Sequence, residues 1–486
     1  MSHADTCAVG RRLYLELLSR EELGQIHETT LDVLENVGVC YHSAQALDVL
    51  EAHGADVNRT TTVAKIPGEL AERALTTLPN QFVLGSRNPE FDLPLDGEHV
   101  YLSTDGCGVL VREADGSVRP SCKADVRLTA HLAQQLEHVS TTSAIVAALD
   151  CPPATRALHE LDACLRGSEK HSIVVSVKDT REALGLLRMA EAVAGGREEL
   201  RRRPLFSAII CTVSPLHQER YGMDLALTLA AAGIPVSFYP MPIVGATAPA
   251  TLAGAAVVAN AEMLSATIVT QLAHPGAKII HGGGPTTMNM STGAYGSNAP
   301  EALLLRAAIG QMADYYSMPS WFGSGATLAK TPGSQSAGEN TLAMLMAYLN
   351  GADVTFGTGL LDGSRMLCLE NIAIDDEVMS VVKRLLRGVT VNAETLAVEL
   401  IKEMACSGSY LTANHTRRHA HELWRAALGE DHPHQIGHDG GAPSTVARAR
   451  ERVDLLCAAA PVDFPHDLAA ELDAIIAATE AEAAKR

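Results

Sequence analysis

The chain has 486 residues, 47% of them hydrophobic and 4% aromatic, with a formal net charge of −19. This length and apolar content suffice for one large α/β domain with extensions, or for two or three smaller domains. The negative charge argues against nucleic acid or an anionic membrane as the main partner and would attract a small cationic molecule. We find no apolar run as long as a membrane span and no signal-peptide pattern in the first ten residues, so we expect a cytoplasmic protein.

Residues 1–135 are predicted to form a helical and β-hairpin extension packed on the main domain. Ser19-Arg-Glu-Glu22 is a capping-box pattern, and the apolar residues after it keep one helical face until Gly38. Two further helices are expected at 43–53 and 67–78, followed by short strands and turns at 82–119.

Residues 136–390 alternate between short apolar segments and helical segments. We expect eight strands, at 143–148, 172–177, 206–213, 236–239, 278–281, 320–323, 354–357 and 368–374. This count predicts an α/β fold of the (β/α)8 TIM-barrel type, whose active site lies on loops after the C-terminal ends of the strands. A doubly wound sheet is the main alternative, but no Gly-x-Gly-x-x-Gly turn follows an early strand.

Residues 391–486 are predicted to form a helical C-terminal tail. The tail ends in sequence rich in Ala and Glu, and we expect it to cover the barrel or a neighbouring subunit. A homo-oligomer is therefore expected.

The stretch from Pro319 to Glu339 is the first candidate for a site. Pro319-Ser-Trp-Phe-Gly323 is typical of a short strand, the residues up to Gly338 are nearly all small or polar, and helical spacing returns at Leu342. A long loop of small residues loses much backbone entropy on folding, so we expect it to line a cavity. Gly325 is expected either to make room for substrate or to need a positive φ.

Phrases between Val236 and Glu377 resemble the trimethylamine methyltransferase family, including its members that lack pyrrolysine. The phrases are Met241-Pro-Ile-Val-Gly-Ala-Thr-Ala-Pro249, Asn260-Ala-Glu262, Gln271-Leu-Ala-His-Pro-Gly276, Thr292-Gly-Ala294, Pro300-Glu301 and Ile374-Asp-Asp-Glu377. The resemblance implies a TIM-barrel enzyme that moves a methyl group from a methylated amine to Co(I) of a separate corrinoid protein. The corrinoid (cobalamin) would then arrive on that partner and not be bound covalently here.

One departure from the family pattern limits what the resemblance implies. The founding members carry pyrrolysine in the loop that corresponds to 323–327, where this chain has only Gly, Ser, Ala and Thr. We align Leu328 and Gly333 with positions where many relatives have Asp, whereas Lys330, Gln335 and Glu339 match. Pyrrolysine chemistry is therefore absent, and the loss of two carboxylates leaves open which amine is used and whether activity is retained.

The candidate site combines family matches with strand-end positions. We predict catalytic roles for Glu262, His281 and Gln335. A quaternary ammonium has no N–H to donate and is bound by aromatic faces and carboxylates. We therefore predict a binding site for a quaternary amine such as a betaine, formed by six further residues: Tyr239, Tyr295, Trp321, Gly325, Phe356 and His415.

Several of these residues have other interpretations. Glu262 could cap a helix or face solvent, and the glycines of His281-Gly-Gly-Gly284 could cradle a phosphate, although a tight turn is favoured. A metal-dependent barrel hydrolase or lyase would use His281, Asp150 and the pair His415 and His419. A non-catalytic betaine-binding homologue is a third interpretation.

The cysteines and one histidine-rich segment carry two further patterns. The ten cysteines contain no Cys-x-x-Cys pair, so no metal site is predicted from them, and Cys107 and Cys211 could line a cleft. His432-Pro-His434-Gln-Ile-Gly437 comes within one residue of the Asp-x-His-x-x-Gly signature of corrinoid-binding modules. Too little chain follows it to build such a module.

Overall fold

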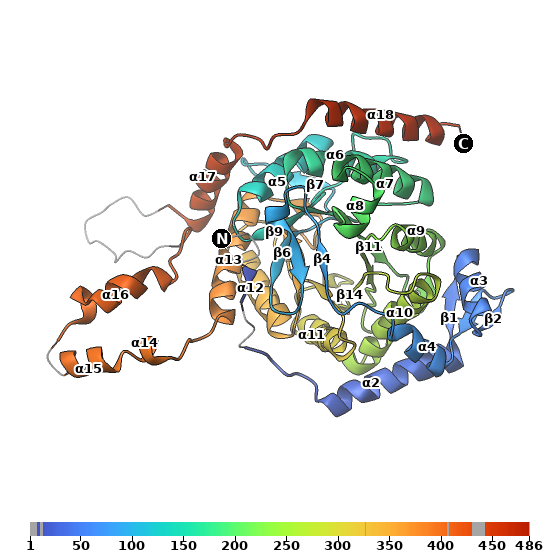
Figure 1. Ribbon diagram of the computed structural model, residues 1–486, viewed down its shortest axis with the longest axis horizontal. Helices are drawn as coiled ribbons and strands as arrows, with labels where there is room; N and C mark the ends of the chain where they lie inside the picture. Colours follow the sequence, from blue (N-terminus) through green and yellow to red (C-terminus); the bar gives the residue numbers. More distant parts are fainter. Residues whose placement is uncertain (1–6, 10–12, 326, 406–407, 430–442, 486) are drawn as a thin grey trace.

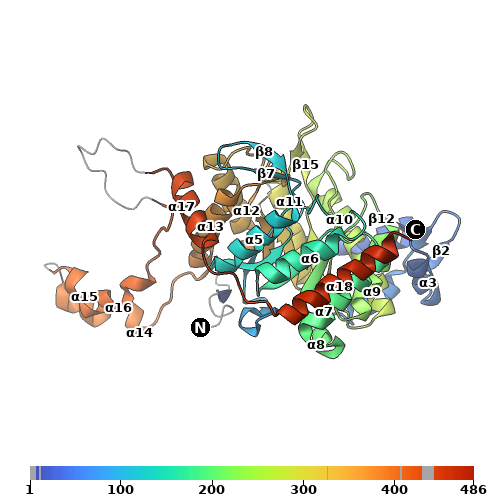
Figure 2. The same ribbon diagram turned by 90° about the horizontal axis from the view of Figure 1, so that it is seen from above.

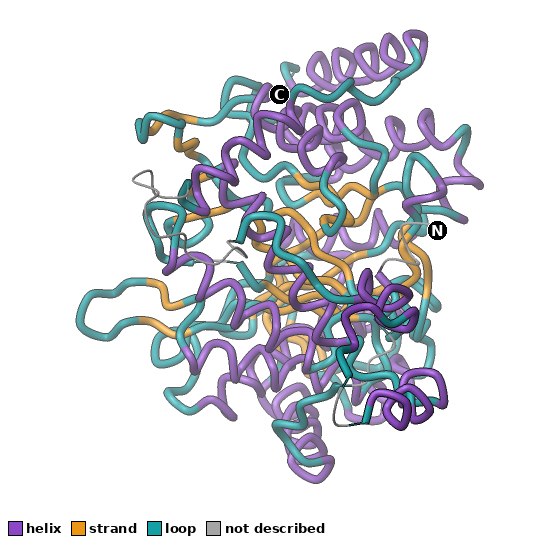
Figure 3. Tube along the Cα trace, turned by 90° about the vertical axis from the view of Figure 1, so that its left-hand side faces the viewer, coloured by secondary structure: helices purple, strands orange, loops and turns teal. Residues whose placement is uncertain are grey.

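The computed structural model describes residues 7–9, 13–325, 327–405, 408–429 and 443–485. Eight parallel strands close a barrel at its centre (Figure 1), in the spatial order β10-β11-β13-β14-β17-β18-β6-β9. Figure 3 shows strands gathered inside a layer of helices. The barrel strands are β6 (Tyr101–Thr104), β9 (Val139–Ser143), β10 (His171–Val174), β11 (Phe206–Cys211), β13 (Val236–Tyr239), β14 (Ile279–Gly283), β17 (Ser320–Gly323) and β18 (Val354–Thr358). The predicted (β/α)8 barrel is confirmed.

One of the eight predicted strands is wrong. Segment 368–374 opens helix α13 (Leu369–Leu386), and the barrel is closed by β6, which pairs with β18 and β9. All four residues of β6 are buried, so its sequence lacks the alternation that marks a half-buried strand. The first barrel strand therefore lies inside the segment predicted as an extension, and β9 ends where the strand predicted at 143–148 was to begin.

The N-terminal extension has the helices expected from sequence. Helix α2 (Arg20–Asp32) begins at the Ser19 capping box and continues as a π-helical turn (Val33–Val37) until Gly38, whose φ is 85°. Helices α3 (Ala44–Ala52) and α4 (Gly68–Leu75) follow, with strands β1 (Val39–Tyr41), β2 (Asp56–Asn58) and β3 (Val63–Lys65). A barrel loop adds β12 (His217–Gln218) to this small sheet in parallel with β1.

The helices around the barrel follow the strands in chain order. They are α5 (Lys123–Gln135), α6 (Arg156–Gly167), α7 (Thr180–Ala194), α8 (Arg197–Arg202), α9 (Arg220–Ala231), α10 (Leu252–Ala273), α11 (Pro300–Tyr315), α12 (Ser334–Leu349) and α13. Helix α10 corrects the expectation of no span-length apolar segment, since its 22 residues are long and apolar enough to cross a membrane. In the fold, 72% of its apolar window is buried, as in a core helix.

Short strands follow several barrel strands and form walls around one end of the barrel. They are β7 (Leu110–Arg112), β8 (Val118–Pro120), β15 (Thr287–Met288), β16 (Tyr295–Gly296), β19 (Leu360–Leu361) and β20 (Met366–Leu367). The pair β4 (Phe82–Leu84) and β5 (Leu93–Leu95) precedes β6. We call the end where the barrel strands finish the barrel mouth.

The tail is helical, as predicted. Helices α14 (Ala393–Leu396), α15 (Val398–Met404) and α16 (Asn414–His419) form an arm that extends away from the barrel (Figures 1 and 2). Helix α17 (Thr445–Cys457) packs on α13, and α18 (His466–Ala483) lies along α7 and α6 (Figure 2). Three 3-10 turns complete the described structure, at Pro89–Phe91, Tyr410–Thr412 and Ala420–Glu422.

Candidate active site

Aromatic rings line the barrel from its interior to its mouth. Tyr239, at the end of β13, lies 5.2 Å from Phe356 of β18 between ring centroids, and Phe356 meets Trp321 edge to face at 6.0 Å. Trp321 is fully buried and belongs to the barrel-interior cluster with Tyr101. Of these three predicted binding residues, Tyr239 and Phe356 therefore lie near the mouth, and Trp321 lies one layer deeper.

The glycines after His281 serve the packing of Tyr239. A Cβ at Gly284 would lie 2.7 Å from the Tyr239 ring, and one at Gly282 would lie 2.9 Å from it. The Tyr239 hydroxyl in turn accepts a hydrogen bond from the Gly323 N–H at 3.0 Å. These contacts explain why glycine is needed at 282 and 284, since any larger side chain would collide with the Tyr239 ring. Neither the phosphate cradle nor the tight turn considered from sequence gives this reason.

A buried guanidinium lies beside these rings. Arg306, on α11, donates to the Gly323 carbonyl at 2.7 Å, to the Ser297 carbonyl, and to Ala302 O and Asn298 Oδ1. Burial lowers the pKa of Arg306, whereas the nearby Tyr239 and Tyr295 hydroxyls act in the opposite direction. All its described hydrogen-bond partners are neutral oxygens, so the positive charge of Arg306 is not neutralised by a described carboxylate.

Tyr295 brings a second hydroxyl to the mouth from the β15–β16 hairpin. Burial raises the pKa of the Tyr295 hydroxyl, and Arg306 lowers it. Tyr295 is still 37% exposed, so its ring is partly open to water while its hydroxyl is shielded. Its predicted role in binding a quaternary amine stays a prediction.

Asp105, which follows β6 directly, was not among the residues predicted from sequence. Its carboxylate is 3% exposed and accepts from the Gly106 N–H at 2.7 Å, and burial raises its pKa. Burial raises the pKa of the Tyr239 hydroxyl, and the negative charge of Asp105 raises it further. Recognition of 101–104 as a barrel strand would have identified this carboxylate, because Asp105 is the next residue.

Two cysteines lie at the mouth end of barrel strands, Cys211 as the last residue of β11 and Cys107 shortly after β6. Cys107 and Cys211 are exposed residues, yet burial raises the pKa of the Cys211 thiol to about 11 and that of Cys107 well above its usual value. Exposure combined with such shielding indicates a recessed position. A raised pKa disfavours the thiolate, so it does not support a nucleophilic role for either residue.

The glycine-rich loop is packed tightly against its neighbour. It spans 324–333, and α12 begins at Ser334, eight residues earlier than expected. A Cβ on Gly325 would overlap the carbonyl and the rest of the Gly357 backbone. Gly325 is therefore required by close backbone approach, and not by the substrate space or the positive φ expected from sequence.

Gln335 and Glu339 stand on the first turns of α12 and hold that loop. The Glu339 carboxylate accepts from Thr327 Oγ1 at 2.6 Å and from the Leu328 N–H at 3.2 Å. Gln335 donates to the same carboxylate at 2.8 Å and is exposed. Gln335 thus lies on the rim as a positioning residue for Glu339.

Glu262 is a fully buried anchor for the loop after β11. Its carboxylate accepts from Thr212 Oγ1 at 2.5 Å, Ser214 Oγ at 2.9 Å and the Leu216 N–H at 3.0 Å. Burial raises its pKa and these three donors lower it. The structure gives Glu262 a role in holding the loop that follows β11 at the mouth, and its catalytic role stays a prediction.

His281 faces away from the mouth. Its neighbour Ile280 points into the barrel, so the His281 ring points outward. It stacks on Tyr316 at 6.2 Å and approaches Phe322 at 6.4 Å. Burial lowers its pKa to about 3, and neither ring nitrogen has a hydrogen-bond partner among the described residues. Nothing in this geometry supports the predicted catalytic role of His281.

The structure does not bring His415 to the mouth, and it does not gather the residues of the metal-dependent interpretation there. His415 lies on the arm, 4.3 Å from His419 between ring centroids. Asp150 instead caps α5 by accepting from the Lys123 N–H at 2.7 Å. The histidines at 432 and 434 lie outside the described residues. The metal centre weighed from sequence is therefore not assembled from the described residues.

The chain is similar to methyltransferases along its whole length. The family model for trimethylamine methyltransferase (MTTB) matches residues 5–484. A trimethylamine methyltransferase MttB of Desulfitobacterium hafniense is 33% identical over 466 residues, 96% of this chain and 94% of that protein. A glycine betaine methyltransferase of the same species is 26% identical, covering 85% of this chain and 86% of its own. The solved monomethylamine methyltransferase MtmB of Methanosarcina barkeri covers 98% of this chain and 96% of its own at 13% identity, with a TM-score of 0.49.

Proposed function

We propose, from the premise that this chain belongs to the trimethylamine methyltransferase family, that it transfers a methyl group from a betaine to a separate corrinoid protein. The family supports a methyltransferase acting on a methylated amine. The observation that selects a betaine is the buried Arg306 guanidinium beside the aromatic rings of the mouth.

A betaine carries opposite charges at its two ends, and the mouth offers a group for each. The faces of Tyr239, Phe356 and Tyr295 suit a quaternary ammonium, and the nearby Asp105 carboxylate adds negative charge when ionised. Arg306 suits the carboxylate, since its positive charge faces neutral oxygens only among its described partners. Trimethylamine and choline lack that carboxylate.

Methyl transfer from a quaternary amine does not require an acid or a base from the protein. The leaving group from a quaternary nitrogen is a neutral tertiary amine, so no general acid is needed. The site is consistent with such a reaction, because burial raises the pKa values of the Cys211 thiol and of the Tyr239 and Tyr295 hydroxyls. The partner's corrinoid would supply the methyl acceptor, while this chain orients one methyl group toward the open mouth and limits water around it.

A substrate panel tests the proposal. The purified chain is mixed with glycine betaine, carnitine, choline or trimethylamine and a reduced corrinoid protein, and demethylated amine is measured. We expect product from a carboxylate-bearing quaternary amine only. Product from trimethylamine alone would overturn the betaine assignment, and calorimetric binding of a betaine without methyl loss would favour the non-catalytic homologue.

We also propose that the chain forms a homo-oligomer through its arm. Exposed apolar side chains gather there, including Leu396 at 52%, Ile401 at 52%, Leu411 at 86% and Leu423 at 67%. Exposed apolar surface of this kind is typical of an interface. Light scattering should give a multiple of the 51.4 kDa chain, and Ile401→Ser with Leu411→Ser should reduce that mass; a monomeric wild type would refute this.

A further inference from the structure

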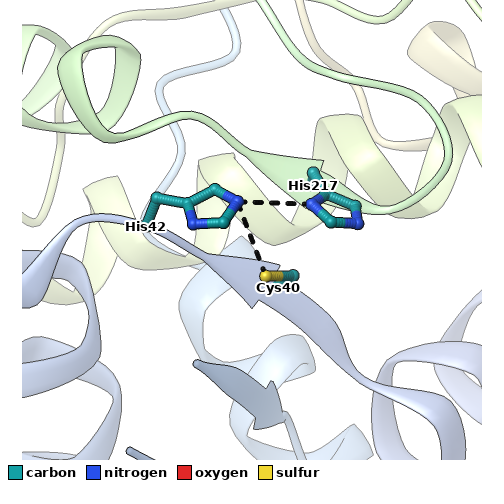
Figure 4. Close-up of side chains that lie close together, drawn as sticks. All are labelled: Cys40, His42 and His217. Carbon is teal, nitrogen blue, oxygen red and sulfur yellow. Dashed lines mark hydrogen bonds between the residues drawn. The ribbon is translucent and has the colours of Figure 1, made fainter. Parts of the chain in front are cut away.

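A cysteine and two histidines meet where the N-terminal extension joins the barrel. Strand β1 of the extension pairs in parallel with β12, and the register places Cys40 opposite His217. His42 is two residues beyond Cys40, so both side chains point to the same side of the strand. The three side chains thus converge from two segments that are distant in sequence, the N-terminal extension and the loop after β11 (Figure 4).

Two of the three separations between the ligand atoms match the edges of a zinc coordination tetrahedron. His42 Nε2 lies 3.7 Å from Cys40 Sγ and 3.3 Å from His217 Nδ1. Zinc bonds of about 2.3 Å to sulfur and about 2.0 to 2.1 Å to nitrogen, at tetrahedral angles, predict separations of about 3.6 Å and about 3.3 Å. The three ligand atoms lie within 4.8 Å of one another.

The surroundings also suit a metal ion. Thr62 Oγ1 lies 3.1 Å from Cys40 Sγ and donates its proton to the Thr61 carbonyl at 2.7 Å, so the Cys40 thiol is the donor in this contact. Thr62 and Leu216, one on each side of the cluster, have φ of 58°, which is uncommon for residues with such side chains. His42 is exposed and the other two residues are half-buried, so an ion has a path of entry.

The other group of possible ligands has a simpler explanation. Glu394, His415 and His419 lie on the arm, where His419 pairs with Glu394 at 3.4 Å and with Glu422 at 2.8 Å. Those contacts are ordinary exposed ion pairs and include no thiol. This group serves better as a control than as a site.

We propose that Cys40, His42 and His217 bind one divalent transition-metal ion of the zinc class, with water as the fourth ligand. The Cys40 thiol releases its proton to solvent on binding, so affinity rises with pH. Cys40 and Leu216 are already linked by an N–H to carbonyl bond of 2.9 Å, and the Leu216 N–H bonds Glu262 at 3.0 Å. The ion therefore clamps the extension to the loop that Glu262 holds, as a structural site.

The experiment uses the full chain, stripped of metal with a chelator and titrated with Zn²⁺ alone by calorimetry. We expect one ion per chain and at least about a 100-fold loss of affinity in Cys40→Ser and in His42→Ala. Cys457→Ser and His419→Ala are the matched controls and should bind normally. Circular dichroism checks that each variant folds. If Cys40→Ser does not fold, His42→Ala still tests the site, because His42 is exposed.

Cobalt substitution identifies the ligand atoms. The Co²⁺-loaded chain should show a sulfur-to-cobalt charge-transfer band that disappears in Cys40→Ser and remains in Cys457→Ser. No stoichiometric binding by the wild type would overturn the site. Unchanged affinity in folded Cys40→Ser and His42→Ala, or loss of binding only in His419→Ala, would overturn it equally.

Discussion

The barrel mouth and the joint between β1 and β12 both gather polar side chains from distant segments, but by different means. At the mouth, Arg306, Tyr239 and Asp105 are shielded and held by many contacts each. At the joint, Cys40, His42 and His217 are half-buried or exposed and are aligned by two paired residues of each strand. The mouth is preorganised by packing, whereas the joint depends on a short register that a bound ion would reinforce.

This difference predicts how each region fails. A change at the mouth removes a group that its neighbours cannot replace, because the surrounding backbone leaves no room to adjust. A change at the joint leaves the barrel intact and acts on the attachment of the extension.

Arg306→Met should reduce betaine turnover by about 30-fold or more, since loss of a buried charged partner costs roughly 2 to 5 kcal/mol. Methionine keeps much of the volume and removes the charge. Rates with glycine betaine and calorimetric binding of choline are measured together, with the thermal midpoint as a check on folding. Equal losses for betaine and choline would show that Arg306 does not bind the carboxylate.

Gly325→Ala should destabilise the fold by about 1 to 3 kcal/mol, because the added methyl overlaps the Gly357 backbone. Gly338→Ala is the matched control within α12, where a Cβ meets nothing within 4 Å. That change should be neutral or stabilising by up to about 1 kcal/mol. Urea unfolding measures both, and a fully stable Gly325→Ala protein would contradict the close approach of the two loops.

The Glu262 carboxyl should make stability depend on pH. Its pKa is raised in the folded state, so the folded chain holds the proton more tightly than the unfolded chain. The stabilising contribution is present below the unfolded pKa of about 4.3 and is lost as pH rises through the folded value. Thermal midpoints across this range should fall less steeply with pH in Glu262→Gln than in the wild type; parallel curves would argue against a raised pKa.

His415→Ala should have the smallest effect. His415 lies on the arm, and its one described hydrogen bond is donated by Nε2–H to the Glu394 carbonyl at 3.2 Å. We expect kcat and KM within about twofold of the wild type and stability within about 0.5 kcal/mol. A large rise in KM would instead mean that the arm of one subunit reaches the mouth of another.

Part of the site could be predicted from sequence because it follows strand ends. Tyr239 and Phe356 lie on strands that the apolar pattern identified, so their place near the mouth followed from barrel geometry. Arg306 and Asp105 were missed for two reasons. Arg306 lies on a helix whose sequence does not show which side chain turns inward, and Asp105 follows a fully buried strand that has no alternation.

The sequence by itself determined the family, the barrel and the Ser19 start of α2, because these depend on local patterns and recurring phrases. Only the tertiary structure decided which side of a strand each residue faces. One position along β14 separates Ile280 inside the barrel from His281 outside it. The tertiary structure also brings Gly325 against Gly357, and Cys40 and His42 against His217. Contacts between such distant segments depend on strand register and packing, which no local sequence pattern records.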